Sequence, residues 1–417
     1  MTTAAGAAPV ERFDDALARR NALLLSVAQA FCGSAAPVAI SLGGLAGIYL
    51  LGPDKSLATA PVTGYNIGVA VTALPAALLM ARIGRRHGFV AGALVGIAGA
   101  LTAAWALALG SFFLFCLGLA GMGVGGAFTQ QFRFAATDEA SPAFRPKAIA
   151  WVLAGGVFAA IIGPQTAIWF RDLFAPVEFA GAYFASAFLV VIGIGALSLL
   201  RFTSPADAAS GASETEPARP LGKIARQPRF VVAVLCAVGS YALMSYVMTG
   251  APLAMVASGI TTDMATLGIQ WHVMAMFAPS FFTGSLIARF GKERIVAAGL
   301  TILAACGIVG LSGVTLGHFW IALVLLGIGW NFGFIGATAM LAETHRASEK
   351  GRAQGLNDLI LFSCVAFASL MSGQTLNAFG DMLTGWDAIN WAIFPVVLVC
   401  LAALGSLRLA RPNDNTA

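Results

Sequence analysis

The chain has 417 residues, of which 59% are hydrophobic and 10% charged, and its formal net charge is +5. Soluble domains carry about 25% charged residues, so the composition excludes a soluble protein and indicates one that is embedded in a lipid bilayer. The small positive charge requires no nucleic acid as partner. The sequence contains no Walker A loop and no catalytic triad, so we do not expect an enzyme.

Apolar runs of about 20 residues, each long enough to cross the hydrocarbon core, recur along the whole chain. They predict twelve transmembrane helices in an all-α fold, centred near residues 33, 71, 98, 122, 159, 190, 242, 276, 305, 330, 365 and 398. The first helix is expected from about Asn21 to Leu50 and contains Pro37. A break in a helix at a proline is tolerated at membrane depth where neighbouring helices or a water-filled cavity satisfy the freed backbone groups.

A long hydrophilic stretch divides the chain into two sets of six helices. Residues 203–228 are rich in Ala, Ser, Glu, Pro and Gly and predict a flexible linker. The expected domains are a cytoplasmic arm at 1–20, six-helix bundles at 21–202 and 229–410 joined by this cytoplasmic linker, and a cytoplasmic tail at 411–417.

The two sets of helices repeat in sequence. The segment ARIGRR at 81–86 aligns with ARFGKE at 288–293, an offset of 207 that also relates Arg145 to Arg352. The repeat predicts two pseudo-symmetric bundles about an axis along the membrane normal. Transporters of this design bind substrate near the midplane between the bundles and work by alternating access.

Basic residues give the expected orientation. Placing both termini in the cytoplasm leaves only Lys55 and Arg171, of the 24 lysines and arginines, on the outer side. This bias follows the positive-inside rule. The alanine- and glycine-rich composition suggests a bacterial source. The expected location is therefore the bacterial cytoplasmic (inner) membrane, and we expect a multi-pass monomer.

Two pairs of possible metal ligands lie in neighbouring helices. Met244 and Met248 are four residues apart, as are His272 and Met276, and residues at this spacing share a helix face. If the hairpin turns symmetrically near Ile260, Met248 lies level with His272 and Met244 level with Met276. Thioether sulfur with imidazole selects Cu(I), so the pattern predicts a copper site.

Simpler interpretations of these residues stay open. Methionine is ordinary apolar filler in a membrane helix. His272 is the only one of four histidines well inside an apolar span. An ionisable group at this depth usually faces a cavity or a polar partner, so a hydrogen bond across helices is the alternative to metal ligation.

The Gly-Arg-Arg loop at 84–86, its copy after the eighth helix and the twelve-helix pattern resemble the major facilitator superfamily over essentially the whole chain. Within it, MxxxM followed by HxxxM resembles the CcoA-type copper importers, which supply copper for assembly of haem–copper cytochrome oxidases. This resemblance implies that Met244, Met248, His272 and Met276 bind copper as the transported substrate, with no separate cofactor. The same branch contains riboflavin transporters with loops similar to QQFRFAATDEASPAFRPKAI at 130–149.

Copper import is therefore our first functional hypothesis, and an organic-solute carrier such as a riboflavin transporter is the alternative. A non-transporting membrane scaffold or sensor is the third. A flavin carrier needs aromatic and amide groups around a central cavity. The candidates are Gln130, Gln131, Arg133, Trp330, Asn331, Gln354, Asn357, Asp358 and Gln374. Asp358 is the deepest carboxylate, and because no acid lies clearly at mid-membrane, facilitated transport is favoured over proton coupling.

Overall fold

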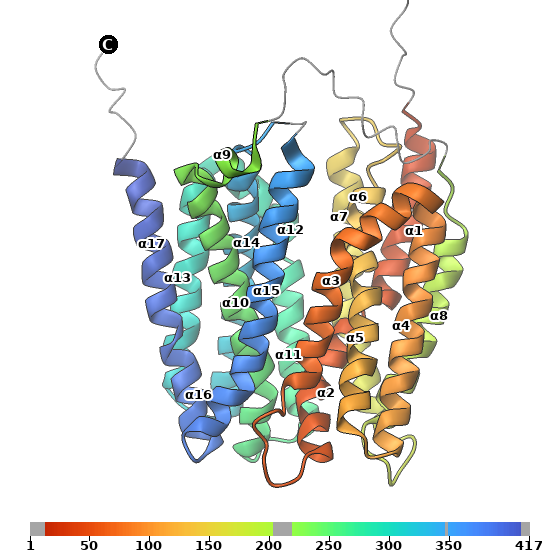
Figure 1. Cartoon of the computed structure of the whole chain (residues 1–417), viewed down its shortest axis with the longest axis vertical. Coiled ribbons are helices and arrows are strands. Elements are labelled where there is room, and N and C mark those ends of the chain that lie inside the picture. The colour runs from red at the N-terminus through yellow and green to blue at the C-terminus, as the bar shows by residue number, and fades with distance from the viewer. Residues whose placement is uncertain (1–12, 203–218, 347–348, 410–417) are drawn as a thin grey trace, which may run out of the picture.

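The computed structural model describes residues 13–202, 219–346 and 349–409 as a bundle of helices (Figure 1). Within these ranges, 11 helices are long and apolar enough to cross a membrane, or 12 if the bent pair α11–α12 forms one span. The predicted all-α membrane fold is confirmed. The tail at 411–417, most of the N-terminal arm and the linker as far as residue 218 lie outside the described residues.

Two groups of helices follow one another along the chain. The N-terminal group comprises α1 (Asp15–Cys32), α2 (Ala35–Leu50), α3 (Ala60–Ile83), α4 (Arg85–Ala108), α5 (Phe112–Thr129), α6 (Phe132–Ala135), α7 (Arg145–Phe170) and α8 (Ala180–Ser198). The C-terminal group comprises α9 (Leu221–Ala225), α10 (Pro228–Ala257), α11 (Thr262–Phe277), α12 (Ser280–Phe290), α13 (Lys292–Leu311), α14 (Leu316–Leu341), α15 (Lys350–Ala378), α16 (Met382–Trp391) and α17 (Ile393–Leu409). Between the groups, α3 packs on α15, α7 on α11, and α2 on α10.

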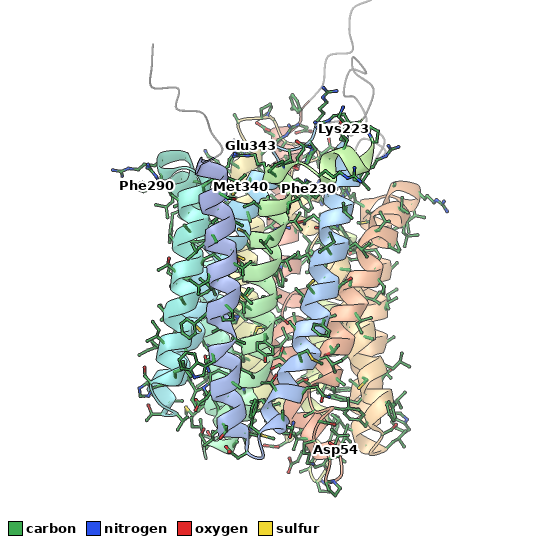
Figure 2. The ribbon with its side chains drawn as sticks, turned by 60° about the vertical axis from the view of Figure 1, so that its left-hand side comes forward. Asp54, Lys223, Phe230, Phe290, Met340 and Glu343 are labelled. Atoms are coloured by element: carbon green, nitrogen blue, oxygen red, sulfur yellow. The ribbon has the colours of Figure 1, made fainter. Side chains whose placement is uncertain are left out.

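The two ends of the bundle are named here from residues that Figure 2 labels. Figure 2 shows Lys223, Phe290 and Glu343 at the end where α9 lies, and Asp54 at the opposite end. We call these the α9 end and the Asp54 end.

The first predicted span begins earlier than expected and is broken. Asp14 caps α1, because its carboxylate accepts hydrogen bonds from the backbone N–H groups of Ala16 and Leu17 at 3.0 and 2.9 Å. The helix therefore begins at Asp15 rather than at Asn21. It ends at Cys32, and α2 continues the span with Pro37 in its first turn, where the missing N–H is tolerated.

A second break lies between α11 and α12, which meet at an angle of 42°. The side-chain amide of Asn331, in α14, donates to the Met276 carbonyl and to Ser280 Oγ, both at 2.7 Å, and its oxygen accepts from Thr283 at 2.6 Å. A broken helix at membrane depth needs such partners, because no water is present to satisfy its polar groups. Asn331 thus holds the bend instead of lining a cavity.

The sequence repeat corresponds to a repeat of backbone conformation. Gly84 joins α3 to α4 at φ 83°, ψ 156°, and Gly291 joins α12 to α13 at φ 86°, ψ 153°. This region of φ/ψ space is open essentially only to glycine. Each loop also forms an ion pair at the α9 end, namely Arg85 with Asp138 and Lys292 with Glu343.

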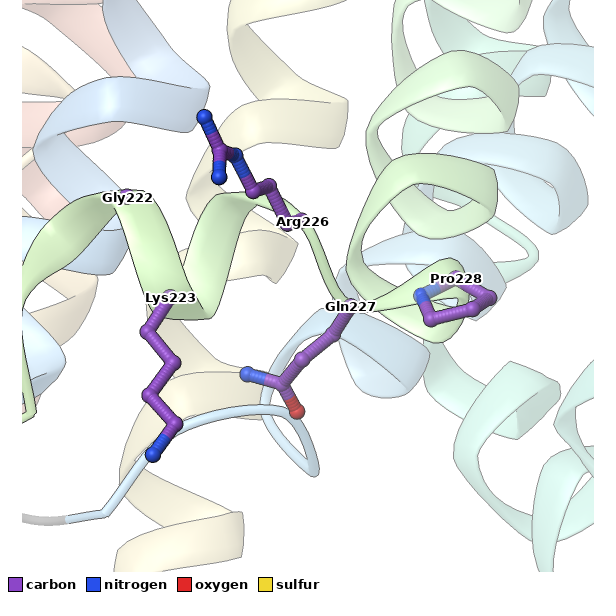
Figure 3. A pocket seen from close by; sticks show the side chains of 5 residues that line it. All are labelled: Gly222, Lys223, Arg226, Gln227 and Pro228. Carbon is purple, nitrogen blue, oxygen red and sulfur yellow. The ribbon is translucent and has the colours of Figure 1, made fainter.

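The described part of the linker is helical and docked on the C-terminal group. Arg219 binds the buried carboxylate of Glu349 at 2.7 Å. The hydrogen bonds from Arg219, acting against burial, hold the pKa of Glu349 well below its usual range. Beside this contact, an open hollow of about 580 Å³ lies at the junction of α9 and α10 and is lined by Gly222, Lys223, Arg226, Gln227 and Pro228 (Figure 3). The hollow lies at the surface, outside the interface between the two groups.

Candidate functional site

Side-chain hydrogen bonds join the two groups towards the Asp54 end. Arg171, at the end of α7, pairs with Asp263 of α11 at 2.6 Å. Further from the Asp54 end, the side-chain amide of Gln165 donates a hydrogen bond to the Gln270 side chain at 3.0 Å. Both contacts connect α7 of the N-terminal group to α11 of the C-terminal group, so they tie the groups together on this side.

Helices α3 and α15 make a second set of contacts at the same end. The hydroxyl of Thr59 accepts a hydrogen bond from the backbone N–H of Gly373 at 3.2 Å. Gln374 donates to the Ser56 carbonyl at 3.0 Å, so this predicted cavity residue instead helps to close the interface. These contacts hold the two groups together at the Asp54 end.

Four aromatic rings from three helices gather in the C-terminal group on the α9 side of these contacts. Tyr241 of α10 lies at their centre, with T-shaped contacts to Trp330 (5.3 Å between centroids) and Phe334 (5.1 Å) of α14. Phe362 of α15 completes the set at 6.1 Å. We call these four residues the aromatic cluster. From the helix lengths at 1.5 Å per residue, it lies roughly 10–20 Å below the α9 end.

The aromatic cluster contains a hydrogen-bond donor that has no partner among the described residues. Trp330 is buried, and its indole N–H has no hydrogen-bond partner among the described residues. Buried polar groups are nearly always satisfied, and an exception calls for an explanation such as an absent ligand. The cluster thus combines stacked aromatic rings with one unsatisfied donor.

Two charged side chains of opposite sign lie beside the cluster, one from each group. Arg133 of α6 is exposed and close enough to Tyr241 and Asp358 to interact electrostatically with both. Asp358 of α15 is also exposed and accepts a hydrogen bond from Asn357 at 3.0 Å. Tyr65 of α3 lies near Tyr241 as well, so both groups of helices contribute to the site.

The four predicted copper ligands are all buried. His272 Nδ1 donates to the Leu323 carbonyl of α14 at 2.8 Å, and its Nε2 has no partner among the described residues. This matches the expected hydrogen bond across helices. It is also the arrangement found in histidines that bind metals through the other nitrogen.

The turn of α10 that precedes Met244 packs on α14. Ser240, one turn before Met244, packs so closely on Gly333 that a Cβ there would lie 2.3 Å from the Ser240 hydroxyl. On the other side, α11 packs on α14 through the turn that carries His272 and Met276. Ligation of copper by Met244, Met248, His272 and Met276 together stays a prediction.

The sequence signal for the aromatic cluster was incomplete. Arg133, Trp330, Asn357 and Asp358 were among the predicted cavity residues, whereas Tyr241, Phe334 and Phe362 were missed. The spacing of Trp330 and Phe334, four residues apart on α14, could have indicated the stacked pair that they form at 5.2 Å. Aromatic residues on separate helices carry no such signal.

The fold and the interface between the two groups are those of a membrane transporter with two helical bundles. A variant of the nucleoside transporter NupG has a similar structure, with a TM-score of 0.68 at 14% identity, covering 94% of this chain and 99% of that one. At this identity the similarity shows the fold alone. The sequence model of the Major Facilitator Superfamily matches residues 22–369. The chain belongs to the Major Facilitator Superfamily, as its loops suggested.

Curated relatives cover nearly the full chain. The riboflavin transporter RfnT of Brucella anthropi is 48% identical over 391 residues, 94% of this chain and 96% of the relative. The uncharacterized transporter YddS of Bacillus subtilis is 29% identical over 92% of this chain and 91% of its own.

The prediction of copper import, with its link to cytochrome oxidase assembly, is wrong. A relative that is nearly half identical along almost the whole chain is a riboflavin transporter, which favours the organic-solute alternative. The physical reason for the error is that paired methionines and a buried histidine also arise from ordinary helix packing.

Proposed function

We propose that the protein transports riboflavin, or a flavin closely related to it, across the membrane. The observation that carries this proposal is the 48% identity to the riboflavin transporter RfnT over 94% of the chain. Transport, rather than catalysis, is the activity that we assign to the site between the two groups of helices.

The aromatic cluster supports a flavin as substrate. The isoalloxazine of riboflavin is a flat system of three fused rings that stacks well on aromatic side chains, and its carbonyl oxygens accept hydrogen bonds. The Trp330 ring stacks on Phe334, and its indole N–H has no partner among the described residues. Arg133 supplies further donors, and Asp358 supplies an acceptor for imide N–H or ribityl hydroxyl groups.

The positions of the basic residues support an orientation for transport. Figure 2 shows Lys223 at the α9 end and Asp54 at the opposite end. By the order of the helices, Lys55 and Arg171 are the only lysine and arginine among the described residues that lie at the Asp54 end. By the positive-inside rule we propose that the α9 end faces the cytoplasm of a bacterium. Because the groups are tied together at the Asp54 end, we propose that this arrangement corresponds to the inward-facing one of an alternating-access cycle.

Reconstituted protein tests this proposal. Wild-type protein in liposomes is expected to take up riboflavin, and purified protein is expected to quench riboflavin fluorescence on binding. Trp330→Ala should weaken binding by about tenfold or more, because stacking of a ring on an aromatic side chain contributes about 1–3 kcal/mol.

The matched control is Trp169→Ala, which removes an indole from the exposed surface of α7. It is expected to bind riboflavin like the wild type. The proposal fails if the folded wild-type protein neither binds nor transports riboflavin. Equal weakening in both tryptophan variants would instead remove the aromatic cluster as the binding site.

A further inference from the structure

Arg171 lies at the Asp54 end and binds one carboxylate from each group of helices. Its guanidinium pairs with Asp263, in the first turn of α11, at 2.6 Å, and with Asp172, its neighbour in the loop after α7, at 3.1 Å. The first pair joins the N-terminal group to the C-terminal group, whereas the second stays within the N-terminal group. One guanidinium is therefore shared between a partner across the interface and a partner in its own loop.

The two helices that carry this contact meet again deeper in the bundle. The side-chain amides of Gln165 and Gln270 form a hydrogen bond at 3.0 Å. Because α7 runs towards the Asp54 end and α11 runs away from it, both amides lie about 10 Å further from that end than the ion pair, at about 1.5 Å per residue. A movement that separates α7 from α11 at this end must therefore break both contacts.

The charges that separate in such a movement both keep a stabilising neighbour in their own group. Arg171 keeps Asp172, and Asp263 keeps the N-terminus of α11, where the helix dipole favours a negative charge. In the closed arrangement, in contrast, the two carboxylates share one guanidinium and repel each other. Arg171, Asp172 and Asp263 are 24%, 65% and 39% exposed, so water solvates them and the pair across the interface contributes little net energy.

We propose that Arg171 and Asp263 form a reversible latch at the Asp54 end, and that Asp172 assists its release by holding Arg171 when the groups separate. This inference rests on alternating access, as the proposed function does, but not on the identity of the solute. Removing the charge of Asp263 favours the open end, because the pair across the interface is lost. Removing the charge of Asp172 favours the closed end, because Arg171 loses its partner in the open arrangement and the repulsion between the carboxylates in the closed one disappears.

Amide hydrogen exchange of the purified full chain measures how often this end opens. The readout is residues 56–63, which belong to the other set of contacts between the groups, where α3 meets α15. Asp263→Asn should make their exchange about two- to fivefold faster, the range that corresponds to an exposed ion pair. Asp172→Asn should make it slower by a similar factor. Both changes should shrink at high ionic strength, because salt screens exposed charges.

Two controls separate this role from net charge and from folding. Glu178→Gln removes an exposed carboxylate from the same loop as Asp172 and should leave the exchange of residues 56–63 unchanged. Each variant is first checked by thermal unfolding, so that a general loss of stability is not mistaken for opening of one end.

The outcomes also separate the latch from the proposed function. Faster exchange in Asp263→Asn together with slower exchange in Asp172→Asn supports the latch, and any other combination overturns it. The measurement needs no solute. If the exchange responds as expected but the wild type neither binds nor transports riboflavin, the latch stands and flavin transport is overturned.

Discussion

At the scale of single residues, burial of polar groups within apolar helices gives two different outcomes. The Trp330 N–H has no hydrogen-bond partner among the described residues, and it belongs to the aromatic cluster that we propose as the flavin site. His272, in contrast, is fully buried and already uses one ring nitrogen to hold α11 on α14 through the Leu323 carbonyl. A histidine with this environment stabilises the bundle whether or not it also binds an ion.

His272→Ala is therefore expected to destabilise the protein by about 2–4 kcal/mol, because it removes a buried hydrogen bond and leaves a cavity. A lower midpoint of thermal unfolding in detergent would show this. His87→Ala, at an exposed position, serves as the control and should change the midpoint little. If Cu(I) raises the midpoint of the wild type but not that of His272→Ala, the histidine is a metal ligand as well.

At the scale of elements, α15 connects the proposed binding site to the contacts at the Asp54 end. Asp358 and Phe362 lie one turn apart and face the site, and Ser369 and Gly373 continue the same side of the helix towards α3. A tilt of this one helix therefore changes the aromatic cluster and the closed end together. Such coupling is what an alternating-access transporter requires.

Gly373→Ala is expected to open the contact between α3 and α15. A Cβ at this position would lie 2.4 Å from the Thr59 hydroxyl, so the two helices must separate. Amide hydrogen exchange over residues 56–63 should become faster. Gly355→Ala adds the same methyl group elsewhere on α15, where nothing lies within 4 Å, and should not change the exchange. Equal exchange in both variants would show that the Thr59 contact does not close this end.

At the scale of the whole molecule, the sequence repeat between the two groups of helices is accompanied by a repeat of backbone dihedral angles. The loops at Gly84 and Gly291 have nearly the same positive φ and extended ψ. Each joins two consecutive helices at the α9 end and is accompanied by an ion pair. A duplicated loop keeps this geometry because no residue with a side chain adopts it without strain.

Replacing either glycine by alanine should cost a similar amount, about 1–3 kcal/mol, since the strained conformation is the same in both loops. Chemical unfolding of Gly84→Ala and Gly291→Ala measures it. Gly195→Ala, within α8 and free of close neighbours, should be neutral or slightly stabilising. If alanine lowered the free energy of unfolding at only one of the two glycines, the two loops would not be energetically equivalent.

The sequence by itself determined the membrane fold, the approximate spans and the duplicated loops, because chain-long hydrophobicity and glycine-containing loops are local properties. It also supplied Arg133, Trp330 and Asp358 as candidates. Only the tertiary structure decided that Asn331 holds a helix bend, that Gln374 closes the Asp54 end, and that Tyr241 and Phe362 join Trp330. The physical reason is that a helix apolar all round has no amphipathic face to mark its inside. Its rotation, and with it the partners of each side chain, is set by packing against helices distant in the sequence.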